Sequence, residues 1–164
     1  MEAPRRVLGL VAAIALLVSG TGQADELREC FSEAGERYGI SPALLRAIAE
    51  VESGLDPRAM HVNGNDTADI GLMQINSWWI PHLQRHGIEP ADLWDPCLNI
   101  GVGAWILAGN IRQFGYSWQA VGAYNAGTRT DQRTAQRRED YAIRVYGRLP
   151  CGAGGLCLDT SQSE

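Results

Sequence analysis

Two carboxylates, seventeen positions apart, are the residues of this chain best suited to acid–base chemistry. Glu52 lies near the C-terminal end of a stretch with helical periodicity, and Asp69 follows a polar passage rich in Gly and Asn. The negative end of the helix dipole and partial burial are both expected to raise the pKa of Glu52. An acid still protonated near neutral pH is what cleavage of a glycosidic bond requires. Glu50 lies on a different helix face, and we expect it to be solvated.

The residues that follow Asp69 are of types found in carbohydrate-binding clefts. Gly71 would let the backbone approach a ligand, and Met73 would supply an adaptable apolar wall. Gln74 and Asn76 carry amides that can bond sugar hydroxyls. The sequence therefore predicts that this segment forms one wall of a cleft.

Aromatic residues stand beside this segment and again farther along the chain. Trp78 and Trp79 could stack on sugar faces, although Trp is a core residue at least as often. Tyr124 and Asn125 place a phenol and an amide near the end of another helix. These residues are further candidates for substrate binding.

Helices joined by short loops are expected to position these groups. Ser41 and Pro42 predict an N-cap followed by proline at the first helical position. Gly54 and Pro57 end the helix over residues 42–53. That helix buries a row of apolar residues at helical spacing, namely Leu44, Leu45, Ile48 and Val51.

The remaining segments predict one mainly α domain. Residues 54–70 are a polar loop, and the turn signals Asn63-Gly64 and Asn65-Asp66 are compatible with a small hairpin. Further helices are expected over residues 25–38, 77–86, 97–114, 118–124 and 134–149.

The N-terminal residues predict export. Arg5 and Arg6 precede a twelve-residue apolar run over residues 7–18, and small residues follow at Gly22 and Ala24. This order is typical of a secretory signal peptide cleaved after Ala24. A membrane anchor is the alternative, but a spanning helix needs about 20 apolar residues. The expected divisions are a signal peptide over 1–24, a domain over 25–149 and a Gly-rich tail over 150–164.

Four cysteines in the expected mature part suggest two disulfides formed in an oxidising compartment. Sequence alone leaves three pairings open. We favour Cys30 with Cys97 and Cys151 with Cys157, because the latter pair would close a short Gly-rich loop. A zinc site is the rival interpretation, but no histidine stands at ligand spacing from a cysteine pair.

The charge balance argues against nucleic-acid binding. The full chain has a formal net charge of −5, and removal of Glu2, Arg5 and Arg6 leaves 12 basic and 18 acidic residues. A general nucleic-acid binder is expected to be basic instead. An arginine cluster is expected to be the solvated face of a helix: Arg129, Arg133, Arg137 and Arg138.

Four short motifs occur in the same order as in a known enzyme family. They span about residues 30–128 and are Ala47-Ile48 with Glu52-Ser53, Gly71-Leu72-Met73-Gln74-Ile75, Asn99-Ile100 with Gly103, and Ala123-Tyr124-Asn125-Ala126-Gly127. Together they resemble the motifs of the soluble lytic transglycosylases. Cys30-Phe31 and Asp95-Pro96-Cys97 look most like the small transglycosylases that accompany type III secretion, pilus or conjugation machines.

The resemblance implies a lysozyme-like α+β fold, a peptidoglycan substrate, a periplasmic location and no metal or organic cofactor. Carried over by motif, Glu52 is the catalytic acid and base, Ser53 is its neighbour, Gln74 lies in the cleft motif and Tyr124 faces the glutamate. In the family, the glutamate protonates the oxygen between N-acetylmuramic acid and N-acetylglucosamine. It then takes the proton of the muramoyl C6 hydroxyl, which closes onto C1 and gives a 1,6-anhydro product without water.

Asp69 departs from the wider family, many of whose members use a single catalytic carboxylate. Residues 67–77 also resemble animal-type lysozymes, in which an aspartate precedes a similar Gly-x-x-Gln-Ile-Asn-Ser run. In lysozyme an ionised carboxylate stabilises the oxocarbenium-like state beside a neutral acid. Asp69 is therefore a second catalytic candidate, with a loop-capping residue as the alternative, and Asp66 is expected to be a turn residue.

Three functions stay open at this point. The leading one is a peptidoglycan lytic transglycosylase, the second is a lysozyme-like muramidase that uses Glu52 and Asp69, and the third is a non-catalytic glycan-binding protein. A component of a secretion or pilus apparatus is the expected protein partner, docked on the tail or on the arginine-bearing helix. Neither nucleic acid nor stable membrane insertion is expected.

Overall fold

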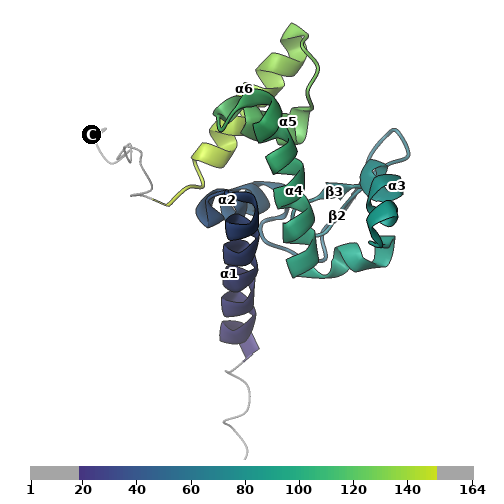
Figure 1. The fold of residues 1–164 in the computed structure, drawn as a ribbon, viewed down its shortest axis with the longest axis vertical. Coiled ribbons are helices and arrows are strands. Elements are labelled where there is room, and N and C mark those ends of the chain that lie inside the picture. Colours follow the sequence, from purple (N-terminus) through teal and green to yellow (C-terminus); the bar gives the residue numbers. More distant parts are fainter. Residues whose placement is uncertain (1–18, 151–164) are drawn as a thin grey trace, which may run out of the picture.

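The computed structural model describes residues 19–150, which form a mainly helical domain with one small sheet (Figure 1). The helices are α1 (Ser19–Tyr38), α2 (Pro42–Ser53), α3 (Ile80–Leu83), α4 (Pro96–Phe114), α5 (Trp118–Ala126) and α6 (Gln132–Tyr146). The strands are β1 (Met60–Val62), β2 (Ala68–Ile70) and β3 (Ile75–Asn76), and 3₁₀ turns cover Ser77–Trp79, Gln84–His86 and Pro90–Trp94. The mainly α fold class with a small hairpin region after α2 is confirmed. Within residues 19–150, no helix has both the length and the apolar content needed to cross a bilayer.

The strongest helix signals predicted the bounds well. α2 has the predicted bounds, and α4 begins at Pro96, the proline expected to open it. α1 begins at Ser19, six positions before its predicted start, so it contains the expected cleavage point at Ala24. Cleavage there and the three expected divisions of the chain stay predictions. The pairing of Cys151 with Cys157 lies outside the described residues.

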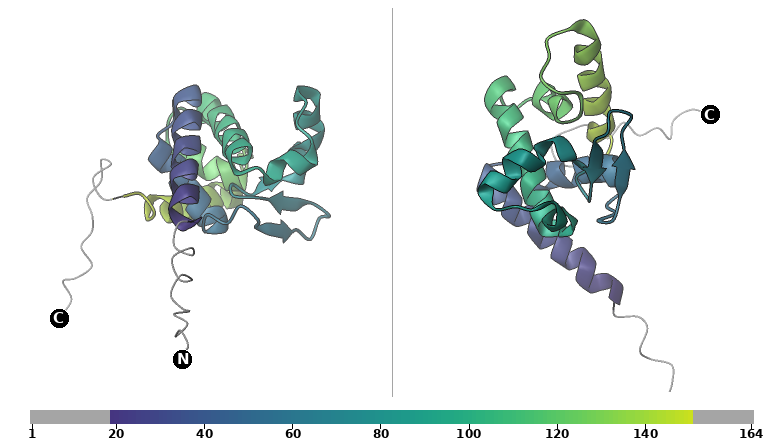
Figure 2. Two further views of the ribbon diagram at one scale, coloured as in Figure 1. Left: turned by 90° about the horizontal axis from the view of Figure 1, so that it is seen from below. Right: turned by 90° about the vertical axis from the view of Figure 1, so that its right-hand side faces the viewer.

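α4 is the central helix of the domain, packed against α1 and α5, and α5 packs against α6 (Figures 1 and 2). Glycines of α4 and α5 allow the closest approaches between these elements. A Cβ on Gly103 would lie 2.7 Å from Cε of Met73, so any side chain there would displace the segment between β2 and β3. A Cβ on Gly122 of α5 would collide with the backbone of Arg138 in α6. These contacts fix the positions of the elements that meet at α4.

The three strands form an antiparallel sheet in the order β1-β2-β3. The predicted hairpin is confirmed, and its turn contains Asp66, which has a φ of 63°. The third strand, β3, was not predicted. Its register pairs Asn76 with Asp69, so these two side chains lie on the same face of the sheet.

One disulfide joins Cys30 of α1 to Cys97 of α4 across 67 residues of sequence. This pair is one of the two that the sequence favoured, and it is confirmed. The bond links the two helices whose packing forms the lower part of the domain in Figure 1.

Ser41 occupies the predicted N-cap position of α2, and Pro42 opens the helix as expected, although the Ser41 side chain makes no capping hydrogen bond. One local expectation was wrong. Arg138 is buried rather than solvated, because its guanidinium donates to the carbonyl oxygens of Gly127 and Arg129. These carbonyls belong to the loop that follows α5. The other three arginines of the cluster are exposed, as expected.

Candidate active site

A cleft of about 620 Å³ lies where the small sheet faces α2, α4 and α5. Six of the predicted site residues line it, together with Trp79; the six are Glu52, Asp69, Gln74, Asn76, Tyr124 and Asn125. Ser53, Gly71 and Met73 do not line it. The view from below in Figure 2 shows the hairpin projecting away from the helices, which leaves one side of the sheet facing α4.

Glu52 lies one residue before the end of α2 and receives a hydrogen bond from the hydroxyl of Tyr141 in α6. Burial is the largest influence on the Glu52 carboxyl and raises its pKa above the ordinary value of 4.5. The Tyr141 bond and the Arg144 charge lower this pKa, whereas the Asp69 charge raises it. The net direction is upward, so the expected shift is confirmed, with burial as its main cause.

Asp69 faces the cleft from β2, with both carboxylate oxygens held by amides. Nδ2 of Asn76 donates to Oδ1 at 2.6 Å, and Nδ2 of Asn63 donates to Oδ2 at 2.9 Å. Oδ1 of Asn76 accepts from the backbone of Trp78, which fixes that amide in turn. No cation of the described residues pairs with Asp69, so its negative charge is available to a positive charge in the cleft.

Gly71 and Met73 lie behind the cleft wall rather than in it. Gly71 has a φ of +74°, and a Cβ there would lie 2.5 Å from Nδ2 of Asn99 and 2.8 Å from the carbonyl oxygen of Leu93. Its small size therefore serves close packing against α4, not the approach of a ligand. The Met73 side chain is fully buried against Gly103. Both residues shape the cleft from the core.

Gln74 has a φ of +49°, a conformation that is unusual for a residue with a side chain. Its amide nitrogen donates to the carbonyl oxygens of Gly71 at 2.8 Å and of Ala59 at 3.1 Å. Both amide hydrogens are thereby used within the protein. The carbonyl oxygen Oε1 is left to accept a hydrogen bond from a sugar hydroxyl.

Asn99 is a residue whose role the sequence did not reveal, although it belongs to one of the four motifs. It is fully buried in α4. Its Oδ1 accepts from the backbone N–H of Met73 at 2.7 Å, and its Nδ2 donates to the carbonyl oxygens of Ile70 and Leu93. Asn99 therefore anchors the segment that carries Gln74 onto α4. The available signal was an amide within the apolar N-terminal part of this helix.

Ser53 and Tyr124 hold the same segment from two other helices. Oγ of Ser53 donates to the carbonyl oxygen of Leu72 at 2.7 Å. The Tyr124 hydroxyl donates to the carbonyl oxygen of Met73 at 2.9 Å. Burial raises the pKa of Tyr124, and the charges of Glu52 and Asp69, which line the same cleft, raise it further. A direct role for Ser53 in substrate binding stays a prediction.

Aromatic groups extend the cleft beyond the carboxylates. Trp79 lines it and packs edge-on against Trp105 at 5.3 Å between ring centroids. Trp78 is 69% exposed and packs edge-on against Trp79 at 4.9 Å. Asn125 is exposed near the end of α5. Among residues 19–150, no three His, Cys, Asp or Glu side chains gather as they would around a metal ion.

Comparison with known protein families gives a match that covers most of the domain. The transglycosylase SLT domain matches residues 29–146, which include the C-terminal half of α1 and every later element through the end of α6. The chain belongs to the SLT transglycosylase family. The lysozyme-like, mainly α architecture expected from the motifs is that of this family.

Individual SLT relatives are similar over comparable lengths. The chain is 47% identical over 122 residues to the X polypeptide of Escherichia coli, covering 74% of this chain and 72% of that protein. It is 41% identical over 137 residues to invasion protein IagB of Salmonella typhimurium, covering 83% and 82%. It is also 41% identical over 128 residues to protein IpgF of Shigella flexneri, covering 77% and 80%.

Tyr141 of this SLT domain contacts the candidate acid Glu52, and the sequence analysis missed this contact. Its ring is buried, and its hydroxyl is the hydrogen-bond donor that orients Glu52. We expect Tyr141→Phe to lower kcat/KM for glycan cleavage by roughly tenfold, because one hydrogen bond to a charged group contributes about 1.5–3 kcal/mol. Tyr146→Phe, on the same helix but 44% exposed, is the matched control. Equal activities of the two variants would contradict this role for Tyr141.

Proposed function

We propose that this chain is a peptidoglycan lytic transglycosylase that cleaves the β-1,4 bond between N-acetylmuramic acid and N-acetylglucosamine. The main support is the cleft itself, which is lined by the partly buried Glu52, whose pKa is raised, and by Asp69, Gln74 and Tyr124. Membership of the SLT family supports the substrate class.

In the first step, protonated Glu52 donates its proton to the glycosidic oxygen, and the bond from that oxygen to C1 of the muramoyl residue breaks. The N-acetylglucosamine part leaves with a free 4-hydroxyl. Positive charge develops on the ring, and the ionised Asp69 stabilises it from the opposite wall. Asn63 and Asn76 already hold the Asp69 carboxylate, so it needs little movement when the charge develops on the sugar ring.

In the second step, ionised Glu52 acts as the base. It takes the proton of the muramoyl C6 hydroxyl, and that oxygen bonds to C1. The product is a 1,6-anhydro ring, Glu52 regains its proton, and no water is consumed. Tyr141 holds the Glu52 carboxyl in position through both proton transfers.

A muramidase is the second candidate function, and Asp69 is the observation that favours it. A glutamic acid paired with an aspartate across the cleft also serves hydrolysis, in which water takes the place of the C6 hydroxyl. Mass spectrometry of purified peptidoglycan digested with the protein separates the two functions. Anhydromuropeptides support the transglycosylase, and reducing-end products, heavier by one water, would overturn it in favour of the muramidase.

Replacement of Asp69 tests whether the second carboxylate contributes to catalysis. We expect Asp69→Asn to lower kcat by about 10²-fold, because it removes a charge aimed at the developing cation. Asp66→Asn is the matched control, since Asp66 is exposed in the hairpin turn and asparagine tolerates its positive φ. If both variants retain wild-type turnover of glycan strands, Asp69 has a structural role only.

The pH dependence of the reaction should report the surroundings of Glu52. Because the acid must be protonated at the start, kcat/KM is expected to fall as pH rises through the raised pKa of Glu52. Tyr141→Phe removes an influence that lowers this pKa, so the fall should move to higher pH. Asp69→Asn removes a charge that raises the pKa of Glu52, so the fall in kcat/KM should move to lower pH. Profiles of kcat/KM that move in the same direction in both variants would contradict this assignment.

We further propose that the protein is exported to the periplasm and opens the wall locally for a secretion or pilus apparatus. The Cys30–Cys97 disulfide fits an oxidising compartment, and one relative is named an invasion protein. N-terminal sequencing of the exported protein should begin at Asp25. Deletion of the gene should impair assembly of the apparatus, and intact assembly would contradict the proposed role.

A further inference from the structure

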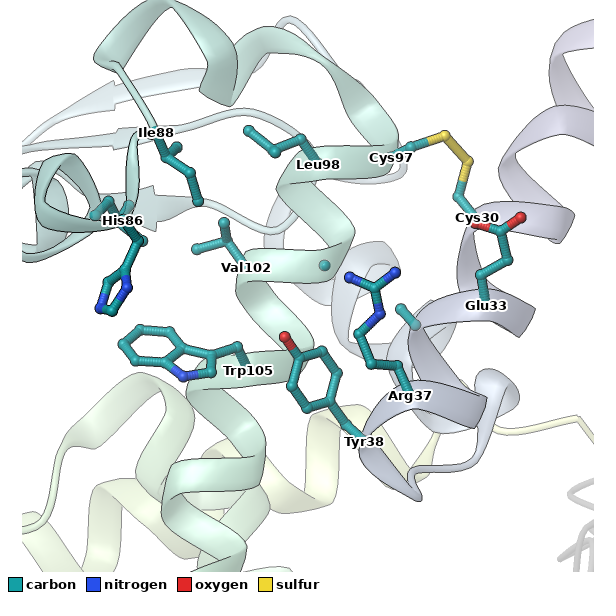
Figure 3. Close-up of a pocket in the computed structure, with 13 residues that line it drawn as sticks. Cys30, Glu33, Arg37, Tyr38, His86, Ile88, Cys97, Leu98, Val102 and Trp105 are labelled. Atoms are coloured by element: carbon teal, nitrogen blue, oxygen red, sulfur yellow. A yellow bond between two sulfur atoms is a disulfide. The ribbon is translucent and has the colours of Figure 1, made fainter.

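A second cavity of about 360 Å³ lies between α1, α4 and the segment over residues 83–88 (Figure 3). It shares no lining residue with the cleft. Its volume falls in the range of pockets that hold small organic ligands, roughly 300–1,000 Å³. None of the residues named in the four motifs lines it, and the proposed reaction does not use it.

The walls of this cavity are mostly apolar. The large apolar side chains come from the segment over residues 83–88 and from α4, namely Leu83, Ile88, Leu98, Val102 and Trp105. The disulfide between Cys30 and Cys97 lies at one end and joins α1 to α4. Because a covalent bond connects two of its walls, the cavity is largely formed before any ligand arrives.

Two hydrogen-bond donors of α1, the exposed Arg37 and the half-buried Tyr38, line this apolar space, and His86 lines it from the segment over residues 83–88. Figure 3 shows the Arg37 side chain reaching from α1 across the cavity toward α4, with the Tyr38 hydroxyl also directed inward. Within residues 19–150, neither group has a hydrogen bond, and Arg37 has no ion pair. The nearby carboxylate of Glu33 lies beside the disulfide and is not paired with Arg37. A cation and a hydroxyl beside an apolar space match the carboxylate and the body of an amphipathic anion.

Gly101 supports the view that this space is kept open for a ligand. It stands inside α4, where glycine destabilises a helix by roughly 1 kcal/mol relative to alanine. Gly103 in the same helix is required by the Met73 contact, but a Cβ on Gly101 would have no atom within 4 Å. Gly101 lines the cavity, so a side chain there would occupy it. Packing within the described residues gives no reason for glycine at this position.

We propose that this cavity binds a carboxylate attached to a bulky apolar group, aromatic or branched-aliphatic. The carboxylate is held by Arg37 and Tyr38, and the apolar group lies among Leu98, Val102 and Trp105. The site is separate from the cleft and does not depend on the transglycosylase reaction.

Isothermal titration calorimetry with 4-phenylbutyrate tests the site, with 4-phenylbutanol as the uncharged probe of the same shape. The acid is expected to bind with a dissociation constant below about 1 mM, and at least about tenfold more tightly than the alcohol. Arg37→Gln should abolish this preference. Equal binding of the two probes to the wild type would overturn the role of Arg37, and with it the proposal.

Gly101→Leu tests the location of the bound probe. Leucine fits the helix and fills the cavity, so binding of 4-phenylbutyrate should weaken by more than about tenfold while the circular dichroism spectrum is unchanged. Gly109→Leu is the matched control in the same helix, because Gly109 does not line the cavity and a Cβ there meets only Arg112, at 3.6 Å. Undiminished binding by Gly101→Leu would overturn the proposal.

The source of the carboxylate is distinguished by a third probe, the tripeptide Gly-Gly-Phe, with its C-terminal amide alongside. The ligand is the carboxyl end of a polypeptide if the tripeptide binds at least tenfold more tightly than 4-phenylbutyrate and its amide does not bind. Weaker binding of the tripeptide than of 4-phenylbutyrate identifies a free small acid. Failure of both probes to bind the wild type would overturn the site altogether.

Discussion

Replacing Glu52 with glutamine is expected to lower kcat for peptidoglycan cleavage by about 10³-fold, because general acid–base catalysis contributes about 10²–10⁴-fold. Glutamine has the same shape, and its carbonyl oxygen still accepts the hydrogen bond from Tyr141. It cannot donate the proton that the leaving oxygen needs, nor take one from the C6 hydroxyl. Release of soluble muropeptides, followed over time, measures the loss.

Glu50→Gln is the matched control for this substitution. Glu50 lies two positions earlier on the same helix, and its carboxylate pairs with Arg46 at 3.0 Å rather than entering the cleft. We expect this variant to retain wild-type turnover. Unchanged lysis by Glu52→Gln would instead support a non-catalytic glycan-binding protein.

Although Glu52→Gln should lower activity, it should raise the stability of the fold. Folding raises the pKa of Glu52 above 4.5. In the pH window between 4.5 and the raised pKa, the native state therefore binds more protons than the unfolded chain. Ionisation of Glu52 therefore lowers the free energy of unfolding across the window and above it. Glutamine removes this cost, so Glu52→Gln should melt at a higher temperature than the wild type at neutral pH. Below pH 4.5 the difference should disappear.

Replacing Asn99 with alanine is expected to cause the largest loss of stability, on the order of 4 kcal/mol in the free energy of unfolding. The substitution leaves three buried backbone groups without their partner, namely the N–H of Met73 and the carbonyl oxygens of Ile70 and Leu93. Each unpaired buried group costs about 1–3 kcal/mol. The segment that carries Gln74 would also lose its attachment to α4, so activity should fall even where the variant is folded. Urea denaturation measures the stability directly.

Asn110→Ala provides the comparison within the same helix. The Nδ2 atom of Asn110 is buried and has no hydrogen-bond partner among the described residues. Its removal should leave the free energy of unfolding unchanged or slightly higher. A similar loss of stability in both variants would show that the hydrogen bonds of Asn99 are not the cause.

The sequence predicted those features that depend on local signals. Pro42 and Gly54 bracket α2, so the position of Glu52 at a helix end and the direction of its pKa shift could be worked out in advance. The orientation of Asp69 could not, because it depends on a strand register that brings Asn76 opposite. Tyr141 reaches Glu52 from 89 positions away, and no local pattern carries that information.

The expectations for Gly71 and Arg138 were wrong for the same reason, because tertiary contacts decide the surroundings of both residues. A glycine needed for close packing looks the same in sequence as a glycine needed for the approach of a ligand, and Gly71 proved to serve packing against Asn99. Arg138 was expected in solvent because arginine usually lies there. Its guanidinium instead donates to the carbonyl oxygens of Gly127 and Arg129, a contact that exists only in the folded chain.

Digestion of peptidoglycan in water enriched in ¹⁸O tests most directly whether the reaction is a transglycosylation. The oxygen that closes onto C1 is expected to be the substrate's own C6 hydroxyl, held near Glu52. The muramoyl products should therefore contain no ¹⁸O and weigh one water less than a hydrolysis product. Incorporation of one ¹⁸O atom at C1 would contradict this expectation, because it would show that water reaches the cation and that Glu52 and Asp69 act together as a muramidase.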